Sequence, residues 1–240
     1  MGTPLLARIE TEDHETKDTP ELLRWATDLY QDKLALSCSF GAEDIVLLDL
    51  LSQINPTPRV FTLDTGRLPP ETYDLMAKIE KRYRLRIQVY YPDRDKVEEM
   101  VNKRGINLFR DSIENRKLCC HIRKVEPLHR ALKGFSAWIT GLRREQSFGR
   151  SDLQVVEQSS NGPVKINPLA NWSHEEVWNY IRSRELPYNK LHDLGYPSIG
   201  CAPCTRPIES GEHIRDGRWW WEQSNKECGL HTLNVIGSTK

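Results

Sequence analysis

Two pairs of cysteines are the clearest chemical feature of this sequence. Cys119 and Cys120 are adjacent, and Cys201 and Cys204 form a C-x-x-C pair later in the chain. Two such pairs, among six cysteines in all, predict a site in which four thiolates bind metal. Neighbouring helical side chains diverge by about 100°, so adjacent thiolates suit separate corners of a cluster better than one tetrahedral zinc ion. We therefore predict one [4Fe–4S] cluster, although the spacings differ from those of bacterial ferredoxins.

The two remaining cysteines have different surroundings. Cys38 lies in an apolar run that is typical of a buried strand, and we expect it to pack in the core. Cys228 lies in a Gly-containing stretch, where an exposed thiolate would be a candidate nucleophile. Arg215, Arg218 and His231 are near enough in sequence to stabilise that thiolate or the anion it attacks. The residues around Cys228 leave its catalytic role open.

Composition narrows the class of protein. The 240 residues carry 34 basic and 34 acidic side chains, so no general basic field for nucleic acid is expected. No apolar stretch is long enough to span a membrane, and the first twenty residues do not resemble a secretory signal. We therefore expect a cytoplasmic protein without nucleic-acid or membrane partners. In that reducing compartment, clustered cysteines favour metal binding or catalysis over disulfides.

Short apolar strands alternate with helical patterns along residues 19–205, the expected nucleotide- and cluster-binding domain. We expect helices over 19–30, 45–51, 70–83, 96–102, 119–132 and 173–184, and strands over 33–40, 59–66, 86–91, 136–141 and 164–168. This alternation predicts an α/β fold with a single, mostly parallel sheet and helices on both faces. Residues 1–18 are expected to form a flexible arm. Residues 206–240 are expected to form a mobile C-terminal extension that carries Cys228.

Three loops are expected at the carboxyl ends of the strands, where parallel sheets bind ligands. Their candidate binding residues are Ser39, Gly41 and Ala42, then Asp64, Thr65 and Gly66, then Gly141, Arg143 and Arg144. Small residues let the backbone approach a phosphate, and arginines can fork onto its oxygens. The sequence has neither G-x-x-x-x-G-K-[ST] nor G-x-G-x-x-G, so the predicted nucleotide site is neither a P-loop nor a dinucleotide site.

Two cations follow the first cysteine pair at helical spacing. Arg123 comes four residues after Cys119, and Lys124 comes four residues after Cys120. Each basic side chain is therefore expected on the same helix face as one thiolate. They either compensate the charge of the thiolates or reach a bound anion.

Several motifs together resemble the assimilatory sulfonucleotide reductases. They are C-C-x-x-R-K-x-x-P-L at 119–128, C-x-x-C at 201–204, G-R-W-W-W at 217–221 and E-C-G-L-H at 227–231. The resemblance covers residues 20–231 and is to the iron–sulfur branch, the adenosine 5'-phosphosulfate (APS) reductases. Residues 39–44 are similar to a modified pyrophosphatase loop of adenine-nucleotide α-hydrolase-like folds. Phe40 precedes a single glycine where ATP pyrophosphatases have S-G-G-x-D-S, which argues against ATP cleavage.

The resemblance implies a reaction in sulfate assimilation and cysteine biosynthesis. Cys228 would attack the sulfur of APS, AMP would leave, and thioredoxin would release sulfite from the resulting S-sulfocysteine. The cluster would order its surroundings rather than pass electrons to the substrate. The cations expected to neutralise the phosphosulfate and the departing AMP are Lys124, Arg143, Arg144, Arg215 and Arg218.

Three alternatives remain at this point. The substrate could be the 3'-phosphorylated relative of APS, PAPS, or both nucleotides, although family members with both cysteine pairs usually prefer APS. An iron–sulfur ATP pyrophosphatase that thiolates tRNA would use a similar sheet, but the zero net charge and the altered loop count against it. The non-enzymatic alternative is a zinc-stapled interaction module. The sequence leaves homo-oligomerisation open.

Overall fold

The fold is built on one six-stranded sheet. The computed structural model describes residues 13–158 and 162–222. The strands are β1 (Leu34–Ser37), β2 (Val60–Leu63), β3 (Gln88–Tyr90), β4 (Ala137–Ile139), β5 (Val156–Glu157) and β6 (Val164–Ile166). Their order is β3-β2-β1-β4-β6-β5, and β5 is antiparallel to β6 while the other pairings are parallel. The predicted mostly parallel α/β sheet is confirmed.

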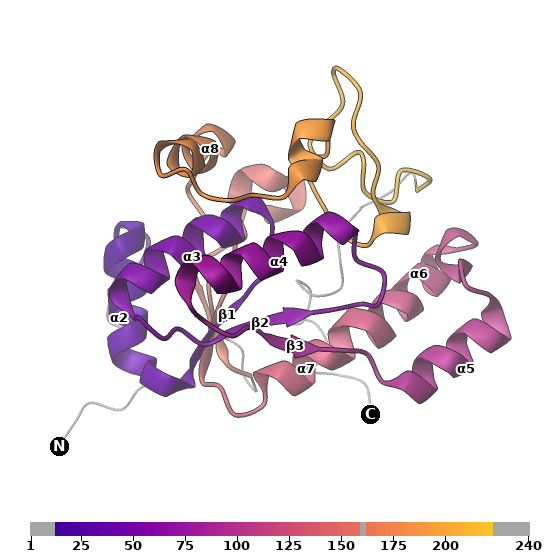
Figure 1. The fold of residues 1–240 in the computed structure, drawn as a ribbon, viewed down its shortest axis with the longest axis horizontal. Coiled ribbons are helices and arrows are strands. Elements are labelled where there is room, and N and C mark those ends of the chain that lie inside the picture. Colours follow the sequence, from indigo (N-terminus) through magenta and orange to yellow (C-terminus); the bar gives the residue numbers. More distant parts are fainter. Residues whose placement is uncertain (1–12, 159–161, 223–240) are drawn as a thin grey trace.

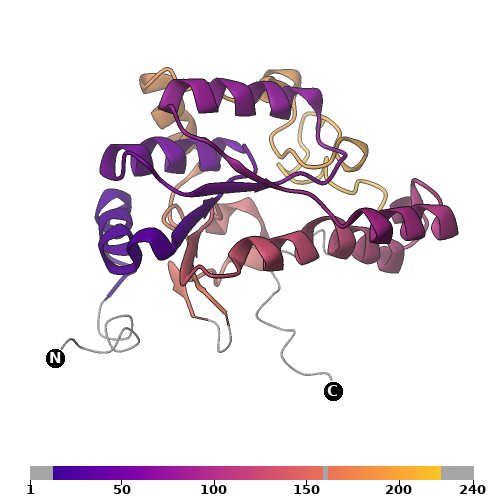
Figure 2. The same cartoon turned by 60° about the horizontal axis from the view of Figure 1, so that its bottom comes forward.

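Helices cover both faces of this sheet. They are α2 (Thr19–Tyr30), α3 (Ala42–Ile54), α4 (Pro70–Tyr83), α5 (Arg94–Arg104), α6 (Ile113–Cys120), α7 (Glu126–Leu132) and α8 (His174–Ser183). Figures 1 and 2 show α3 and α4 on one side of the sheet and α7 on the other, with α5 and α6 projecting beyond it. Because strand side chains alternate, Leu36 of β1 joins the core under α2, α3, α4 and α8, whereas Ala35 joins the core under α7.

Local sequence explains where the helices begin. The side chain of Asp18 accepts from the Glu21 amide at the start of α2, so Asp18 is the N-cap of this helix. Asp18 and Glu21 form a capping box. At α8 Ser173 and Glu176 form a second capping box. These caps fix the direction in which the chain leaves each preceding loop.

The helix expected over 119–132 differs in the structure. Helix α6 already begins at Ile113, because the Ser112 hydroxyl caps it by accepting from the Asn115 amide at 3.1 Å. The chain then changes to a π-helical turn over His121–Val125 before α7 begins. Such a turn changes the angular spacing of side chains within a helix. The first cysteine pair therefore lies at a junction between two helical forms.

Strand β5 was not expected from the sequence. It has two residues, Val156 and Glu157, which is too short for a period-two pattern to stand out. It is antiparallel to β6 and forms one edge of the sheet.

Segments at both ends of the predicted domain contact it. The ring of His14 lies 4.3 Å from the ring of Trp25, and the Glu15 carboxylate lies 2.8 Å from the Arg144 guanidinium. At the other end Trp219, from the segment that follows residue 205, is buried in a cluster with Leu108, Phe109 and Cys119. Two predicted site residues, Cys228 and His231, lie outside the described residues.

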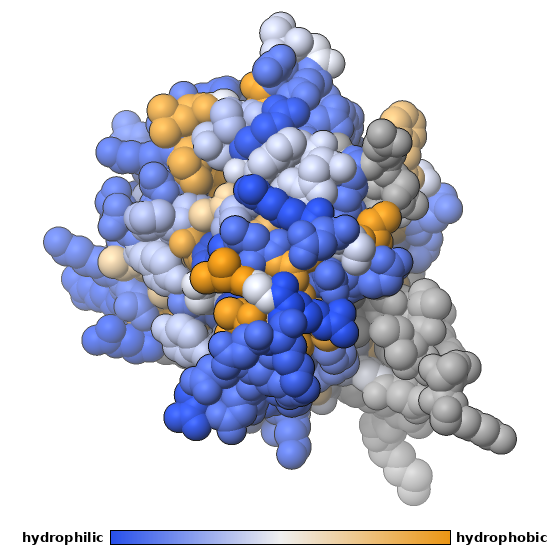
Figure 3. Space-filling view, turned by 90° about the vertical axis from the view of Figure 1, so that its right-hand side faces the viewer, coloured by the Kyte–Doolittle hydropathy of each residue, from blue (hydrophilic) through white to orange (hydrophobic). Residues whose placement is uncertain are grey.

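Hydrophobic side chains are scattered over the described surface. The exposed large ones include Phe148, Tyr91 and Leu194, which come from separate loops. Figure 3 shows a mostly hydrophilic face in which the hydrophobic patches are small and separated. Within the described ranges, no helix is both long enough and apolar enough to cross a bilayer.

Candidate active site

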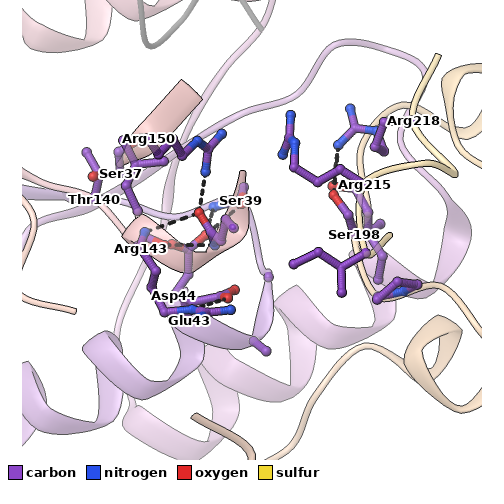
Figure 4. A pocket seen from close by; sticks show the side chains of 18 of the residues that line it. Ser37, Ser39, Glu43, Asp44, Thr140, Arg143, Arg150, Ser198, Arg215 and Arg218 are labelled. Carbon is purple, nitrogen blue, oxygen red and sulfur yellow. Dashed lines mark hydrogen bonds and ion pairs between the residues drawn. The ribbon is translucent and has the colours of Figure 1, made fainter. Parts of the chain in front are cut away.

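A cavity of about 190 Å³ opens at the carboxyl ends of β1, β2 and β4. We call it the nucleotide cavity. Of the residues predicted to bind substrate, those that line it are Ser39, Gly41, Ala42, Lys124, Gly141, Arg143, Arg215 and Arg218. Figure 4 shows the labelled side chains approaching from two sides, with Arg215, Arg218 and Ser198 on one side and Glu43, Asp44 and Arg143 on the other. Parallel strand ends and the N-terminus of α3 thus meet at one site.

The loop after β1 makes a tight turn into α3. Phe40 has a φ of +63°, which is uncommon for an aromatic residue, and its side chain is buried. Core packing therefore holds the turn. Gly41 caps α3, and a Cβ there would have its nearest described neighbours at an ordinary 3.7 Å. Packing within the described protein does not demand glycine at this position, so the small residue leaves room for a ligand to approach the backbone.

Asp44 joins the first loop to the third. Its carboxylate accepts from the Ser39 amide at 2.6 Å and from the Ser39 hydroxyl at 2.7 Å. Burial raises the pKa of Asp44 to about 6, while these hydrogen bonds act in the opposite direction. A Cβ at Gly141 would lie 2.5 Å from the Asp44 carboxylate. Gly141 is therefore required for the close contact between the two loops, which sequence alone did not indicate.

Arg143 is buried and bound by acidic side chains. Its Nε lies 2.9 Å from Glu43 and its Nη1 lies 2.9 Å from Glu145. The same Nη1 donates to the Trp172 carbonyl at 3.1 Å. Arg143 thus connects the loop after β1 with the approach to α8, and carboxylates already balance its charge.

The Arg144 side chain makes its contacts outside the nucleotide cavity. It donates to the Leu153 carbonyl at 2.8 Å, contacts the Asn171 side chain and forms an ion pair with Glu15. It is not among the described residues that line the nucleotide cavity. Arg143 has an extended backbone, whereas Arg144 is the first residue of a 3₁₀ turn, and of the two only Arg143 lines the cavity.

Lys124, Arg215 and Arg218 form what we call the cationic end of the nucleotide cavity. The Arg218 guanidinium donates to neutral acceptors: the Cys204 carbonyl at 3.4 Å, the Ile199 carbonyl at 3.3 Å and the Ser198 hydroxyl at 3.5 Å. Neutral partners leave the guanidinium charge uncompensated by these contacts. This end is therefore suited to an anionic group.

The structure adds residues that sequence reasoning missed. Arg150, His174 and His192 also line the nucleotide cavity. Burial lowers the pKa of both histidines, and the Arg143 charge lowers that of His174 further. Near neutral pH they therefore offer hydrogen bonds rather than charge. Arg150 comes shortly after Arg143 in the segment that follows β4, and this position could have indicated it. Nothing in the sequence singled out His192.

The second predicted loop lies beside the cysteines. The carboxylate of Asp64 accepts from the Tyr73 hydroxyl at 3.0 Å and from the Gly66 amide at 2.8 Å. The Thr65 hydroxyl lies 3.3 Å from the Cys201 sulfur, and the Thr65 carbonyl accepts from Arg123 at 2.6 Å. Asp64, Thr65 and Gly66 are not among the described residues that line the nucleotide cavity. Their observed contacts instead hold the loop against the cysteine site.

All four predicted metal ligands line one smaller cavity of about 20 Å³, which we call the cysteine cavity. Cys119 and Cys120 come from α6, and Cys201 and Cys204 come from the following C-x-x-C turn. Within the described ranges no three cysteine, histidine or acidic side chains are grouped as around one metal ion. The four thiols instead border a shared space.

The chemistry of the cysteine cavity fits a bound cluster. Burial raises the pKa of Cys204 to about 12 and raises that of Cys119, whereas nearby cations act in the opposite direction. For Cys119 the largest opposing charge is that of Arg123, which is one of the two roles left open for this residue above. Buried thiols of this kind become thiolates when metal ions balance their charge. Together with Cys120 and Cys201 they supply four thiol donors, which match the ligand set of an iron–sulfur cluster.

Comparison with known families identifies related proteins. Residues 33–207 match the model of the phosphoadenosine phosphosulfate reductase domain. The adenosine 5'-phosphosulfate reductase of Allochromatium vinosum is 52% identical over 202 residues, which cover 83% of this chain and 79% of that protein.

Solved structures of other proteins are also similar to this chain. The phosphoadenylyl-sulfate reductase of Candida auris, in a phosphate complex, has a TM-score of 0.69 and 33% identity over 85% of this chain and 97% of that one. FMN adenylyltransferase of Candida glabrata has a TM-score of 0.57 at 14% identity, over 95% of this chain and 86% of that one. The latter similarity concerns the fold alone. It agrees with the predicted adenine-nucleotide α-hydrolase-like architecture.

Proposed function

Because the chain belongs to the phosphoadenosine phosphosulfate reductase family, we propose that it reduces APS to sulfite and AMP, with Cys228 as the nucleophile and thioredoxin as the reductant. As a member of this family it is an oxidoreductase that acts on sulfur. The alternatives of a tRNA-thiolating pyrophosphatase and of a zinc-stapled interaction module receive no support from these relatives.

One observation carries the proposal: Lys124 and Arg218 line both the nucleotide cavity and the cysteine cavity. An adenylate bound along the strand ends would direct its anionic group toward these cations. A phosphosulfate carries negative charge on both its phosphate and its sulfate, so fixed cations favour its binding there. They also stabilise the charge that grows on AMP as it leaves.

In the first step the Cys228 thiolate attacks the sulfur of APS. A bond forms between the two sulfur atoms, and the bond from sulfur to the bridging phosphate oxygen breaks. The electron pair of that bond leaves with AMP, so Cys228 carries an S-sulfonate. Lys124, Arg215 and Arg218 would hold the phosphosulfate and neutralise AMP in this step.

In the second step a thioredoxin thiolate attacks the Cys228 sulfur. A bond forms between the thioredoxin sulfur and the Cys228 sulfur. The bond between the Cys228 sulfur and the sulfonate sulfur breaks, and sulfite leaves with its electron pair. The second thioredoxin thiol then releases Cys228, so the dithiol of thioredoxin becomes a disulfide and supplies both electrons. Such a reaction would take place in the cytoplasm, where thiols are kept reduced, and would serve sulfate assimilation and cysteine biosynthesis.

Cys119, Cys120, Cys201 and Cys204 would hold one [4Fe–4S] cluster. Bound there, the cluster would supply positive charge to the four thiolates and link α6 to the C-x-x-C turn. Lys124 and Arg218, which line both cavities, would then lie between the cluster ligands and the substrate.

Mass spectrometry tests the first step. Anaerobically purified full-length protein is mixed with APS in the absence of reductant, digested and analysed. We expect a sulfonate on the peptide that contains Cys228 and AMP in equal amount; thioredoxin should then release sulfite. Cys228→Ser should lose the adduct and the turnover while it retains AMP binding. If the wild-type peptide stays unmodified while AMP is released, Cys228 is not the nucleophile.

A matched control variant is Cys38→Ala. The Cys38 thiol is buried, and burial raises its pKa well above the ordinary value. Its removal should leave adduct formation on Cys228 unchanged.

Substrate preference is tested separately. We expect a higher kcat/KM for APS than for PAPS, because the family members that carry both cysteine pairs usually prefer APS. A higher value for PAPS would overturn this part of the proposal without affecting the assignment of Cys228.

A further inference from the structure

Arg218 lines both the nucleotide cavity and the cysteine cavity, yet the hydrogen bonds of its guanidinium are long. Its three carbonyl and hydroxyl acceptors lie at 3.3–3.5 Å. Bonds of this length weakly restrict a side chain with several rotatable torsions. Something other than these hydrogen bonds must therefore fix the position of the guanidinium, whose side chain is 6% exposed.

The ring of Trp219 packs against the Arg218 guanidinium. The Cζ atom of Arg218 lies 4.8 Å from the centre of this ring, within range for a cation–π contact. Trp219 is buried and has a φ of +44°, so surrounding packing determines its placement. The guanidinium of Arg116 also lies over this ring, at 4.7 Å, and is bound to Glu222 at 2.6 Å. The ring is thus supported by a buried ion pair.

Gly200, which precedes the C-x-x-C turn, also lies close to the Arg218 guanidinium. A Cβ at this position would lie 2.5 Å from Cζ of Arg218 and 2.9 Å from Nη1. Gly200 is not one of the glycines with a positive φ, so backbone conformation does not explain the residue type. The guanidinium occupies the space that any side chain at position 200 would need.

We propose that Gly200 is a positioning residue for Arg218: its missing side chain admits the guanidinium between the C-x-x-C turn and Trp219, where it binds the anionic group of the nucleotide. This deepens the proposed function and rests on the same cavity. Gly200 itself need not touch the ligand. Any side chain at position 200 would displace the positive charge from the cationic end.

The variant Gly200→Ala is suited to test this. The atoms that the new methyl group would meet belong to the far end of a flexible side chain, so Arg218 can move while the fold persists. Loss of one charge-assisted hydrogen bond predicts that the Kd for AMP rises about 10- to 100-fold. The inhibition constant for adenosine, which has no phosphate, should stay within about twofold, and the thermal midpoint and cluster absorbance should be unchanged.

Gly217→Ala is the matched control. The same methyl group at that position would meet the carbonyl oxygen of Arg206, which is backbone and cannot rotate away. This variant should lower the thermal midpoint and weaken AMP and adenosine binding alike. A parallel loss of both ligands in Gly200→Ala would show a general structural effect and overturn the proposal.

A double-mutant cycle makes the test specific. In an Arg218→Ala background, Gly200→Ala should have little further effect on AMP affinity, because the displaced group is already gone. Full additivity, or an unchanged Kd in Gly200→Ala alone, would overturn the positioning role. AMP serves as the probe so that this result is independent of turnover; failure of the wild-type protein to release sulfite from APS would instead refute the proposed function.

Discussion

Arg143 and Arg218 are both buried arginines that line the nucleotide cavity, but their surroundings differ. Arg143 is bound to Glu43 and Glu145 at 2.9 Å each. Arg218 instead meets carbonyl oxygens, a hydroxyl and the Trp219 ring. The two groups approach the cavity from opposite sides in Figure 4.

This difference separates two uses of the same side chain. An arginine whose charge is balanced by carboxylates mainly fixes the loops that supply those carboxylates. An arginine among neutral partners keeps a charge that an incoming anion can use. On this basis we assign Arg143 chiefly to the shape of the cavity and Arg218 to the binding of the anion.

The largest effect is expected on stability, at the buried Arg116–Glu222 pair. Arg116 contacts the same Trp219 ring as Arg218. Glu222→Gln keeps the size of the side chain but removes its charge, leaving Arg116 without this carboxylate. Because both side chains are nearly inaccessible, at 3% and 5%, we expect a loss of about 3–5 kcal/mol in the free energy of unfolding. Chemical denaturation measures this.

A partly exposed pair provides the control for that measurement. Glu212→Gln removes the charge that faces Arg206, at 28–29% side-chain exposure. Its effect should be much smaller, because solvent screens the charges. Equal losses in the two variants would contradict the support that we assign to the buried pair.

The next effect concerns turnover. Arg218→Ala should lower kcat/KM for APS about 100- to 1,000-fold, the range for removing one preorganised donor from a developing anion. The free energy of unfolding should change less than in Glu222→Gln. A steady-state assay with thioredoxin measures the first quantity. A change below about fivefold would remove Arg218 from the anion-binding role.

Asp44 tests the opposite end of the cavity through pH. Its pKa of about 6 exceeds the ordinary 3.8, so the folded protein binds more protons than the unfolded chain between these values. Stability should therefore fall as pH rises from about 4 to about 6 and then stay level. Asp44→Asn should remove this dependence and add up to about 3 kcal/mol at pH 8. Denaturation at pH 4 and pH 8 tests the sign.

The smallest effect is expected at Arg143. Arg143→Ala leaves Glu43 without its guanidinium, and the unmatched carboxylate should cost about 1–3 kcal/mol of unfolding free energy. Turnover should fall less than in Arg218→Ala. If Arg143→Ala instead reduced kcat/KM more strongly while stability stayed the same, the two assignments would have to be exchanged.

Local patterns predicted much of the fold. The strands around Leu36, Phe61 and Ile139 are apolar runs bounded by turn residues, and each strand appears close to its expected range. Their parallel order places the first and third loops at one edge, as predicted. Two-residue β5 and the π-helical turn at His121–Val125 lack such a pattern, because neither completes a period that sequence can display.

Composition and short-range periodicity establish which groups are available: four paired thiols, a set of arginines and a sheet whose loops converge. Neither requires knowledge of distant partners. Long-range contacts in the folded chain set the role of each side chain. Arg144 is held by Glu15 and Arg218 by Trp219 and Gly200, and the folded chain alone sets these contacts and therefore which charges remain available to a ligand.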